Sequence, residues 1–470
     1  MKRIYPTAIL LSLFLMLLTF HLNANDNFRL SVELPQAANG QVLLAHYYGG
    51  NLLVDDTLRL DAQGRGEVRR DTLLPEGIYK LYFNQEHHFD FLLGAQQELH
   101  LVNPTFSVAD MRISGPAESE AFLAYMHWLN EQQQRRSLLE EQRQTASPAQ
   151  RTVAEMELEQ LNRRVINYWL TTAEAFPGSF LSAFLLSNYY QEPFPEDIPE
   201  TVLGNDSLLW HYRYNHRKDH FFDYFDLTDE RLLYTPVIKA KFDAYFLNIL
   251  IQQYDSLRPS AYRILSLTES SPLMFRFAVS YLLNYAHNSR VMGMDALFAD
   301  IARDYYLTDK TPWMDENGLA IIKENLQFIE NNLIGMPAVD FQMENLEGDP
   351  FRLYQLQSKY TVVIFYEPNC GHCREYLAGL YKEIYLPYRD KGFDVVAVYS
   401  MTNRNEWKQY IDENGYIDWH NIWDEHHLTR FRVVWDTRLT PSVYLLNEDK
   451  QIVAKKFSLD YLHFILPQVL

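Results

Sequence analysis

Apolar and polar residues follow three different patterns along the chain. Between residues 28 and 115, short apolar runs, several of them alternating with polar residues, are separated by Gly, Pro, Asn or Asp. This spacing predicts an antiparallel β domain of the sandwich or barrel type. The predicted strands are 28–34, 41–48, 56–61, 66–71, 77–83 and 89–94. Asn39-Gly40 and Gln63-Gly64 are dipeptides typical of hairpin turns.

The second pattern covers residues 117–335. Apolar residues recur there at spacings of three and four, and Gly and Pro are sparse except at breaks such as Pro177-Gly178 and Pro259. This periodicity predicts an all-α domain. The stretch has no clean internal period, so a solenoid of repeats is not expected.

The third pattern, over residues 336–470, alternates strand and helix. Buried strands are predicted at 361–366 and 393–400, with a helix between them that ends near residue 389. Further elements are a helix near 405–413, strands at 418–423, 442–447 and 451–457, and a C-terminal helix. Such β-α-β units predict an α/β layer fold. The expected fold class is therefore multidomain, with an antiparallel β domain (28–115), an all-α domain (117–335) and an α/β domain (336–470).

Residues 1–24 have the pattern of a cleaved signal peptide. Lys2 and Arg3 precede an apolar run, 8–20, and a short polar segment follows to Ala24. The run is shorter than the roughly 20 residues that span a bilayer, so cleavage is expected, with residual N-terminal anchoring as the alternative. The sequence therefore predicts an exported protein in a compartment where disulfides persist.

Composition and charge restrict the partners. The chain has 470 residues, of which 47% are hydrophobic and 14% aromatic, as expected for several folded domains. Its net charge is −19 and no basic segment offsets it, which argues against nucleic acid as a partner. No Gly-rich phosphate loop and no Gly-x-Ser-x-Gly motif occurs in the sequence.

The two cysteines, Cys370 and Cys373, stand where the predicted strand 361–366 passes into a helix. At a helix N-terminus, unpaired N–H groups and the helix dipole stabilise a thiolate at the first position. The second sulfur lies one turn away on the same face, near enough to form a disulfide. This arrangement indicates a redox-active dithiol.

Two other interpretations of the pair are a purely structural disulfide and half of a zinc site. A disulfide that closes so short a loop stabilises the fold little through chain entropy. The sequence has no second cysteine pair to complete a zinc site. Redox chemistry is therefore favoured, with the Cys370–Cys373 pair as the only redox group and no separate cofactor or metal.

The order of elements and three short motifs resemble the thioredoxin fold, and specifically the TlpA-like exported bacterial thiol–disulfide oxidoreductases. The motifs are the segment Pro337-Ala-Val-Asp-Phe341, the strand that leads into Cys370-Gly-His-Cys373, and Thr440-Pro441 before the next-to-last strand. Residues 28–335 are similar to the β and helical domains that precede such modules in some exported proteins. The resemblance implies a periplasmic enzyme that acts on protein disulfides and receives electrons from a membrane donor.

The resemblance also implies roles for individual residues. Cys370 is the exposed nucleophile and Cys373 the resolving thiol that attacks the mixed disulfide. Pro441 is expected in the cis form, which leaves the backbone of Thr440 free to pair with an extended substrate segment. His372 is expected to stabilise the Cys370 thiolate.

The sequence departs from the family at two positions. Ile364 stands where thioredoxin has a buried acid, and Tyr376 where many TlpA-like proteins have a glutamate, with Glu375 one position earlier. Glu367, three residues before Cys370, is then the candidate proton acceptor.

The direction of the reaction stays open between two possibilities. The Cys-Gly-His-Cys motif resembles that of disulfide isomerases, with a potential of about −180 mV against about −270 mV for thioredoxin. TlpA-like proteins are commonly reductases, and a reductase is the prediction. A disulfide isomerase is the first alternative, and a non-catalytic binding or scaffold protein with an incidental cysteine pair is the second.

The helical part offers one further candidate site. His216 and His220 are four residues apart, a spacing that allows two metal ligands on one helix face. The residue after the first histidine is Arg217, where a zincin has its catalytic glutamate. A solvated helix face is therefore the favoured interpretation, and the β and helical domains are expected to bind a protein partner or to form a homodimer.

Overall fold

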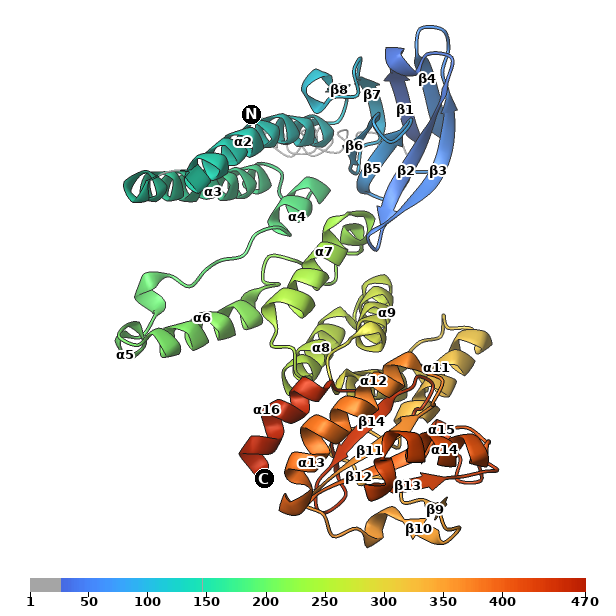
Figure 1. Ribbon diagram of the computed structural model, residues 1–470. Coiled ribbons are helices and arrows are strands. Elements are labelled where there is room, and N and C mark those ends of the chain that lie inside the picture. Colours follow the sequence, from blue (N-terminus) through green and yellow to red (C-terminus); the bar gives the residue numbers. More distant parts are fainter. Residues whose placement is uncertain (1–26, 146) are drawn as a thin grey trace, which may run out of the picture. The chain divides into compact units, whose positions relative to one another are not determined.

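The computed structural model describes residues 27–145 and 147–470, and the described part forms two compact units that meet in the sequence between Leu250 and Ile251 (Figure 1). The predicted signal peptide, 1–24, lies outside the described residues. None of the helices in the described part is long and apolar enough to cross a membrane.

The first unit begins with eight strands in two four-stranded sheets, ordered β4-β1-β7-β8 and β3-β2-β5-β6. The strands are β1 (Phe28–Glu33), β2 (Gln41–Tyr48), β3 (Asn51–Arg59), β4 (Arg65–Arg70), β5 (Gly77–Tyr82), β6 (His88–Leu93), β7 (Glu98–Val102) and β8 (Arg112–Ser114). Pairing is antiparallel except between β1 and β7, which run parallel. The β domain predicted from the alternating pattern is confirmed.

Residues that alternate along the strands build the core between the two sheets. Phe28, Leu30 and Val32 of β1 are buried, as are Val42 and Leu44 of β2, and all belong to one apolar cluster. The intervening residues of β1 face away from this core, which is the pattern that the sequence showed.

The prediction of hairpins at Asn39-Gly40 and Gln63-Gly64 is wrong. Both dipeptides lie in turns, but β1 and β2 belong to different sheets, and so do β3 and β4. Asn39 and Gly64 have positive φ values of 60° and 77°, which is why the sequence favours turns there. Local turn propensity does not specify which strands pair after the turn.

Helices complete the first unit. They are α2 (Ala117–Thr145), α3 (Pro148–Ala175), α4 (Phe180–Leu186), α5 (Glu200–Leu203), α6 (Asp206–His220) and α7 (Val237–Asp243). Phe122 of α2 and Phe180, Leu181 and Leu185 of α4 pack on Ile78 and Leu92, on the opposite face of the β3-β2-β5-β6 sheet from the β core.

The second unit combines further helices with a seven-stranded sheet ordered β10-β9-β13-β12-β11-β14-β15. Its strands are β9 (Gln342–Asn345), β10 (Pro350–Arg352), β11 (Tyr360–Tyr366), β12 (Phe393–Tyr399), β13 (His420–Trp423), β14 (Ser442–Leu446) and β15 (Ile452–Lys455). Its helices are α8 (Tyr254–Thr268), α9 (Pro272–Asn288), α10 (Met294–Ile301), α11 (Glu316–Ile329), α12 (Gly371–Gly379), α13 (Leu386–Tyr388), α14 (Arg404–Asn414), α15 (Phe431–Val434) and α16 (Leu459–Val469).

The strand β11 lies inside the sheet, parallel to β12 and antiparallel to β14. Its side chains alternate between two cores. Val362 and Ile364 join one apolar cluster with residues of α12 and α16, and Val363 and Phe365 join another with Trp435. A strand covered on both faces explains the continuous apolar run in the sequence.

The helices α8–α11 belong to the same compact unit as the α/β sheet. Lys455 of β15 is almost fully buried, and its Nζ pairs with Asp295 of α10 and donates to the carbonyl oxygen and the Oδ1 of Asn332, each at 2.8 Å. The stretch predicted as one helical domain is thus divided between the two units. Its helical character and the α/β character of the last stretch are both confirmed.

Candidate active site

Cys370 and Cys373 lie where β11 ends and α12 begins. Cys370 is the N-cap residue of α12, and its main-chain N–H donates to the Glu367 carbonyl oxygen at 3.1 Å. Its Sγ in turn accepts a hydrogen bond from the main-chain N–H of Cys373 at 3.3 Å. The first sulfur therefore occupies the position where a helix N-terminus favours negative charge.

The two sulfurs differ in exposure. Both cysteines are free thiols in the structure, Cys370 partly exposed and Cys373 fully buried in the apolar cluster beneath α12. Burial alone would raise the pKa of Cys370, but hydrogen bonds from the Cys373 thiol and main-chain N–H outweigh burial and hold the pKa below its ordinary value. Burial raises the pKa of Cys373 to about 12. One thiol is thus prepared to react as a thiolate while the other keeps its proton.

Thr440 and Pro441 lie in the loop before β14, and Thr440 contacts Cys370. The Thr440–Pro441 peptide bond is cis. The Cys370 thiol donates to the Thr440 carbonyl oxygen, with Sγ and oxygen 3.6 Å apart. Because β14 runs antiparallel to β11, the loop before β14 lies at the same end of these two strands as the start of α12.

The same loop is fixed by a buried carboxylate. Asp436 accepts from Arg438 Nε at 2.6 Å and from Lys456 Nζ at 2.7 Å. Its carbonyl oxygen accepts from the Ser442 hydroxyl at 3.2 Å. These contacts close the loop over residues 436–442 and hold Thr440 in place.

The remaining predicted site residues lie around Cys370. His372 is exposed in the first turn of α12, and Glu367 is partly buried and contacts Cys370 through its main-chain carbonyl oxygen. Ile364 is buried among apolar residues, and the Tyr376 hydroxyl donates to the Phe457 carbonyl oxygen at 3.3 Å. The two positions at which the sequence departs from the family pattern thus hold an apolar and a phenolic side chain.

Sequence reasoning missed one residue beside the site, Glu406 of α14. Its Oε1 accepts from Asn369 Nδ2, and its Oε2 accepts from the Tyr399 hydroxyl, both at 2.9 Å. Glu406 therefore fixes the turn that presents Cys370. The available signal was weak, because an N-cap asparagine at 403 followed by a first-turn glutamate is an ordinary helix start.

Each of the two candidate histidines of α6, His216 and His220, has a side chain of its own as a hydrogen-bond partner. His216 Nδ1 lies 2.7 Å from the Tyr190 hydroxyl, and His220 Nδ1 lies 2.7 Å from Asp223 Oδ2. Across the described ranges, 27–145 and 147–470, no group of three or more His, Cys, Asp or Glu side chains is arranged to hold a metal ion.

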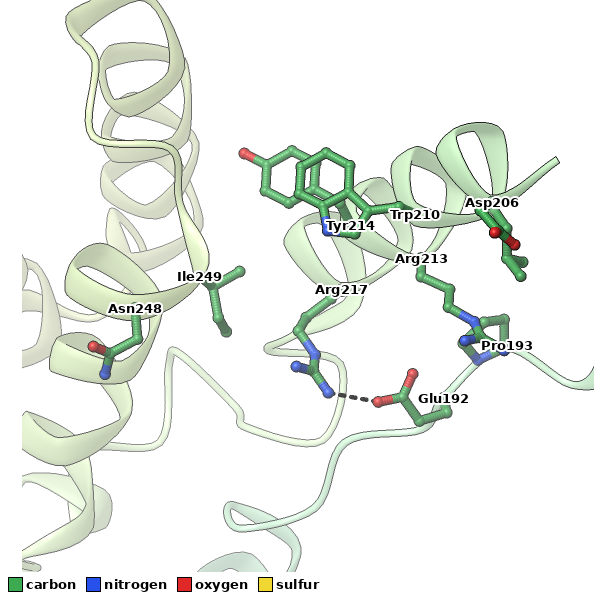
Figure 2. A pocket seen from close by; sticks show the side chains of 10 residues that line it. Glu192, Pro193, Asp206, Trp210, Arg213, Tyr214, Arg217, Asn248 and Ile249 are labelled. Atoms are coloured by element: carbon green, nitrogen blue, oxygen red, sulfur yellow. Dashed lines mark hydrogen bonds and ion pairs between the residues drawn. The ribbon is translucent and has the colours of Figure 1, made fainter. Parts of the chain in front are cut away.

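A cavity of about 750 Å³ lies along the same helix (Figure 2). Arg217 extends into it and pairs with Glu192 at 2.5 Å, as Figure 2 shows. Trp210 and Tyr214 stack with their ring centroids 5.4 Å apart. These residues form a mixed aromatic and charged surface that contains neither cysteine.

Comparisons with known proteins match two parts of the chain to family models. Residues 334–455 match the AhpC/TSA family, and residues 174–332 match a domain of unknown function, DUF5106. The chain is 26% identical over 152 residues to the thiol-disulfide oxidoreductase ResA of Halalkalibacterium halodurans. The aligned region covers 30% of this chain and 83% of that protein.

Two solved structures are examples of similar proteins. A domain of a possible thiol-disulfide isomerase from Cytophaga hutchinsonii is 32% identical, with 29% of this chain and 92% of that chain covered and a TM-score of 0.28. A thioredoxin-like protein from Bacteroides caccae is 19% identical, with 60% and 99% covered and a TM-score of 0.46.

The family match and the ResA relative confirm the resemblance found in the sequence. The α/β part of the second unit has the thioredoxin fold, and the chain is an enzyme of the thiol–disulfide oxidoreductase class.

Proposed function

We propose that this chain is an exported reductase of protein disulfides that works through the Cys370–Cys373 dithiol. The observation that carries the proposal is the unequal pair of thiols. The pKa of Cys370 is held low at the N-terminus of α12, and the pKa of Cys373 is raised by burial one turn below. Such a difference makes Cys370 the attacking sulfur and Cys373 the sulfur that reacts second.

Two displacement steps complete the reaction. The Cys370 thiolate attacks one sulfur of the substrate disulfide, whose S–S bond breaks and releases the other sulfur as a thiolate that takes up a proton. Cys373 then loses its proton and attacks Cys370 Sγ, and the mixed disulfide breaks to release the first substrate sulfur. The substrate gains two electrons and two protons, and the Cys370–Cys373 pair becomes a disulfide.

Thr440 supports the placement of substrate in this scheme. Its carbonyl oxygen lies 3.6 Å from Cys370 Sγ, so the main chain of this loop borders the reacting sulfur. An extended polypeptide that pairs with the Thr440 backbone would therefore bring its own cysteine next to Cys370. Glu367 is proposed as the group that accepts the proton of Cys373, and His372 as the side chain that adjusts the potential.

The reductase needs a supply of electrons. We infer a membrane-bound dithiol donor that reduces the Cys370–Cys373 disulfide by the reverse sequence of displacements. Export across the inner membrane to the periplasm follows from the predicted signal peptide, and a homodimer built by the β and helical parts is proposed for the assembled state.

Trapping experiments test the proposal. In the Cys373→Ser variant, Cys370 attacks substrate but the mixed disulfide cannot be resolved, so disulfide-linked partners should accumulate on non-reducing gels. The matched Cys370→Ser variant removes the attacking sulfur and should trap none. If neither variant traps a partner, the chain is a binding or scaffold protein instead.

The reduction potential of the Cys370–Cys373 pair decides the direction. A value near about −270 mV or lower in a glutathione series is expected for a reductase. A value near about −180 mV would favour the isomerase, for which His372 beside the attacking cysteine is the specific observation.

A further inference from the structure

A second cavity, of about 440 Å³, lies beside the loop that carries Thr440. Its lining comes from the end of α9, the α9–α10 connection, α10 and α11, and from Arg438, Leu439, Lys455 and Lys456. All of these residues belong to the second compact unit. The cavity is therefore a feature that the helices before the thioredoxin fold add next to the cysteine pair.

The cavity lies close to the sulfur of Cys370. Leu439 lines the cavity, and the next residue, Thr440, contacts Cys370 Sγ through its carbonyl oxygen. Met292, also in the lining, packs against the same apolar cluster as Cys370. An extended chain advances about 3.3 Å per residue. A side chain one or two positions from a substrate cysteine would thus reach the cavity.

The lining combines apolar and cationic side chains. Phe298 is buried and Met292 partly buried, while Leu439 has 83% of its surface exposed. Arg290 is exposed on the α9–α10 connection, and Arg438 and Lys456 are about half exposed. An exposed leucine beside cationic side chains suits a ligand with both an aliphatic stem and a negative charge.

The balance of charge favours an anion. Arg438 and Lys456 share the single carboxylate of Asp436, and Lys455 pairs with Asp295. Together with Arg290, four cations stand against two carboxylates in a chain whose net charge is −19. A local excess of positive charge in an acidic protein is the complement of an acidic side chain.

We propose that this cavity binds a glutamate or aspartate side chain one or two residues from the reactive cysteine of the substrate polypeptide. This inference rests on the proposed function. It makes Arg290, Arg438 and Leu439 determinants of specificity, with the guanidinium groups binding the carboxylate and Leu439 contacting the methylene groups.

Paired peptides test the inference on the full-length reduced chain. Each peptide carries one cysteine as a mixed disulfide with thionitrobenzoate, and members of a pair differ only by Glu or Gln at one position flanking the cysteine. The rate of thionitrobenzoate release gives the ratio of second-order rate constants within each pair. We expect the Glu peptide to react about fivefold faster at one flanking position, and the ratio to fall as salt is added.

Two charge-reversal variants complete the design. Arg290→Glu should bring the Glu/Gln ratio to one or below. Lys323→Glu changes the net charge equally at an exposed position of α11 outside the cavity lining, and should keep the ratio of the native chain.

Two results would overturn the inference about the cavity, and a third, different result would overturn the proposed function. A ratio of one at every flanking position in the native chain would overturn the inference, and so would a ratio that survives in Arg290→Glu. A chain that releases no thionitrobenzoate from any peptide, and does not exchange with a small uncharged disulfide, would instead overturn the proposed function.

Discussion

Cys370 and Cys373 carry the same side chain but lie in different surroundings. Cys370 accepts a main-chain hydrogen bond at the start of α12 and remains partly exposed, whereas Cys373 is buried against apolar residues. A free cysteine has a pKa of about 8.5. The fold therefore gives two identical groups different pKa values, lowered for Cys370 and raised for Cys373.

This separation predicts the pH dependence of alkylation. The rate at which iodoacetamide modifies Cys370 should rise with pH to a midpoint below that of an ordinary cysteine, because the folded protein lowers the pKa of this thiol. Cys373 should stay unmodified until strongly alkaline pH, since burial raises its pKa to about 12. Mass spectrometry of the labelled peptides measures both.

A pair of variants isolates the hydrogen bond between the thiols. Cys373→Ala removes the side-chain donor and should move the Cys370 midpoint upward, whereas Cys373→Ser keeps a hydroxyl donor and should move it less. Parallel labelling of both cysteines in the native chain would contradict this account.

Asp436 is the second residue whose surroundings set its charge. Burial alone would raise the pKa of this carboxyl, but hydrogen bonds from Arg438 and Lys456 outweigh burial and hold the pKa below its usual range. A carboxyl whose pKa is lower in the folded state stabilises the fold above its unfolded pKa, and this contribution is lost as pH falls through the folded pKa.

Asp436→Asn should therefore lower the free energy of unfolding by about 1–3 kcal/mol at pH 7, because two cationic partners lose their carboxylate. The difference from the native chain should begin to shrink as the pH falls below about 4, where the carboxyl of the unfolded chain takes up a proton, and should disappear only below the lower pKa of the folded carboxyl. Urea unfolding at a series of pH values measures it, and a difference that is constant with pH would refute the assignment.

At the scale of elements, β11 links the two cores of the sheet. Phe365 is fully buried, and its ring lies 5.6 Å from the rings of both Phe431 and Trp435, measured between centroids. Because β11 leads directly to Cys370, packing on this strand also fixes the start of α12.

Phe365→Ala should cost about 3–5 kcal/mol of folding free energy through lost burial and a residual cavity. Phe464→Ala is the matched control, since Phe464 of α16 is 68% exposed and its truncation should change stability by less than about 0.5 kcal/mol. Chemical denaturation followed by circular dichroism compares the two. Equal losses would show that β11 is not central to the core.

Element types could be predicted because local periodicity encodes them. The apolar run of β11 and the three- and four-residue spacing of apolar positions in the helices are properties of residues close together in the sequence. The position of Cys370 at a helix start is another such local property. Strand partners across the turns at Asn39 and Gln63 could not be predicted, since pairing depends on contacts distant in sequence. Glu406 was missed for the same reason, because it reaches Asn369 only after folding.

At the scale of the whole molecule, the cysteine pair belongs to a unit larger than the thioredoxin fold. Lys455 is buried in the sheet, and its partners Asp295 and Asn332 come from the helical region. Arg438 likewise donates to Asn325 of α11 at 2.8 Å, and its guanidinium carbon lies 4.2 Å from the Phe328 ring centroid. The helices from α8 onward therefore complete the environment of the loop that carries Thr440.

This dependence predicts how fragments behave. A fragment of residues 251–470 should unfold cooperatively and keep the reduction potential of the full chain, because it retains every partner of Lys455 named above. A fragment of residues 336–470 lacks Asp295 and Asn332, so it loses both partners of Lys455 and the packing of the helices that carry them. Its melting temperature should accordingly be lower. Asp295→Asn in the full chain removes the same carboxylate without shortening the protein, and should reproduce part of that loss. Equal melting temperatures for the two fragments would show that the helices before residue 336 do not stabilise the thioredoxin fold. The claim that they complete the environment of the Thr440 loop would then be wrong.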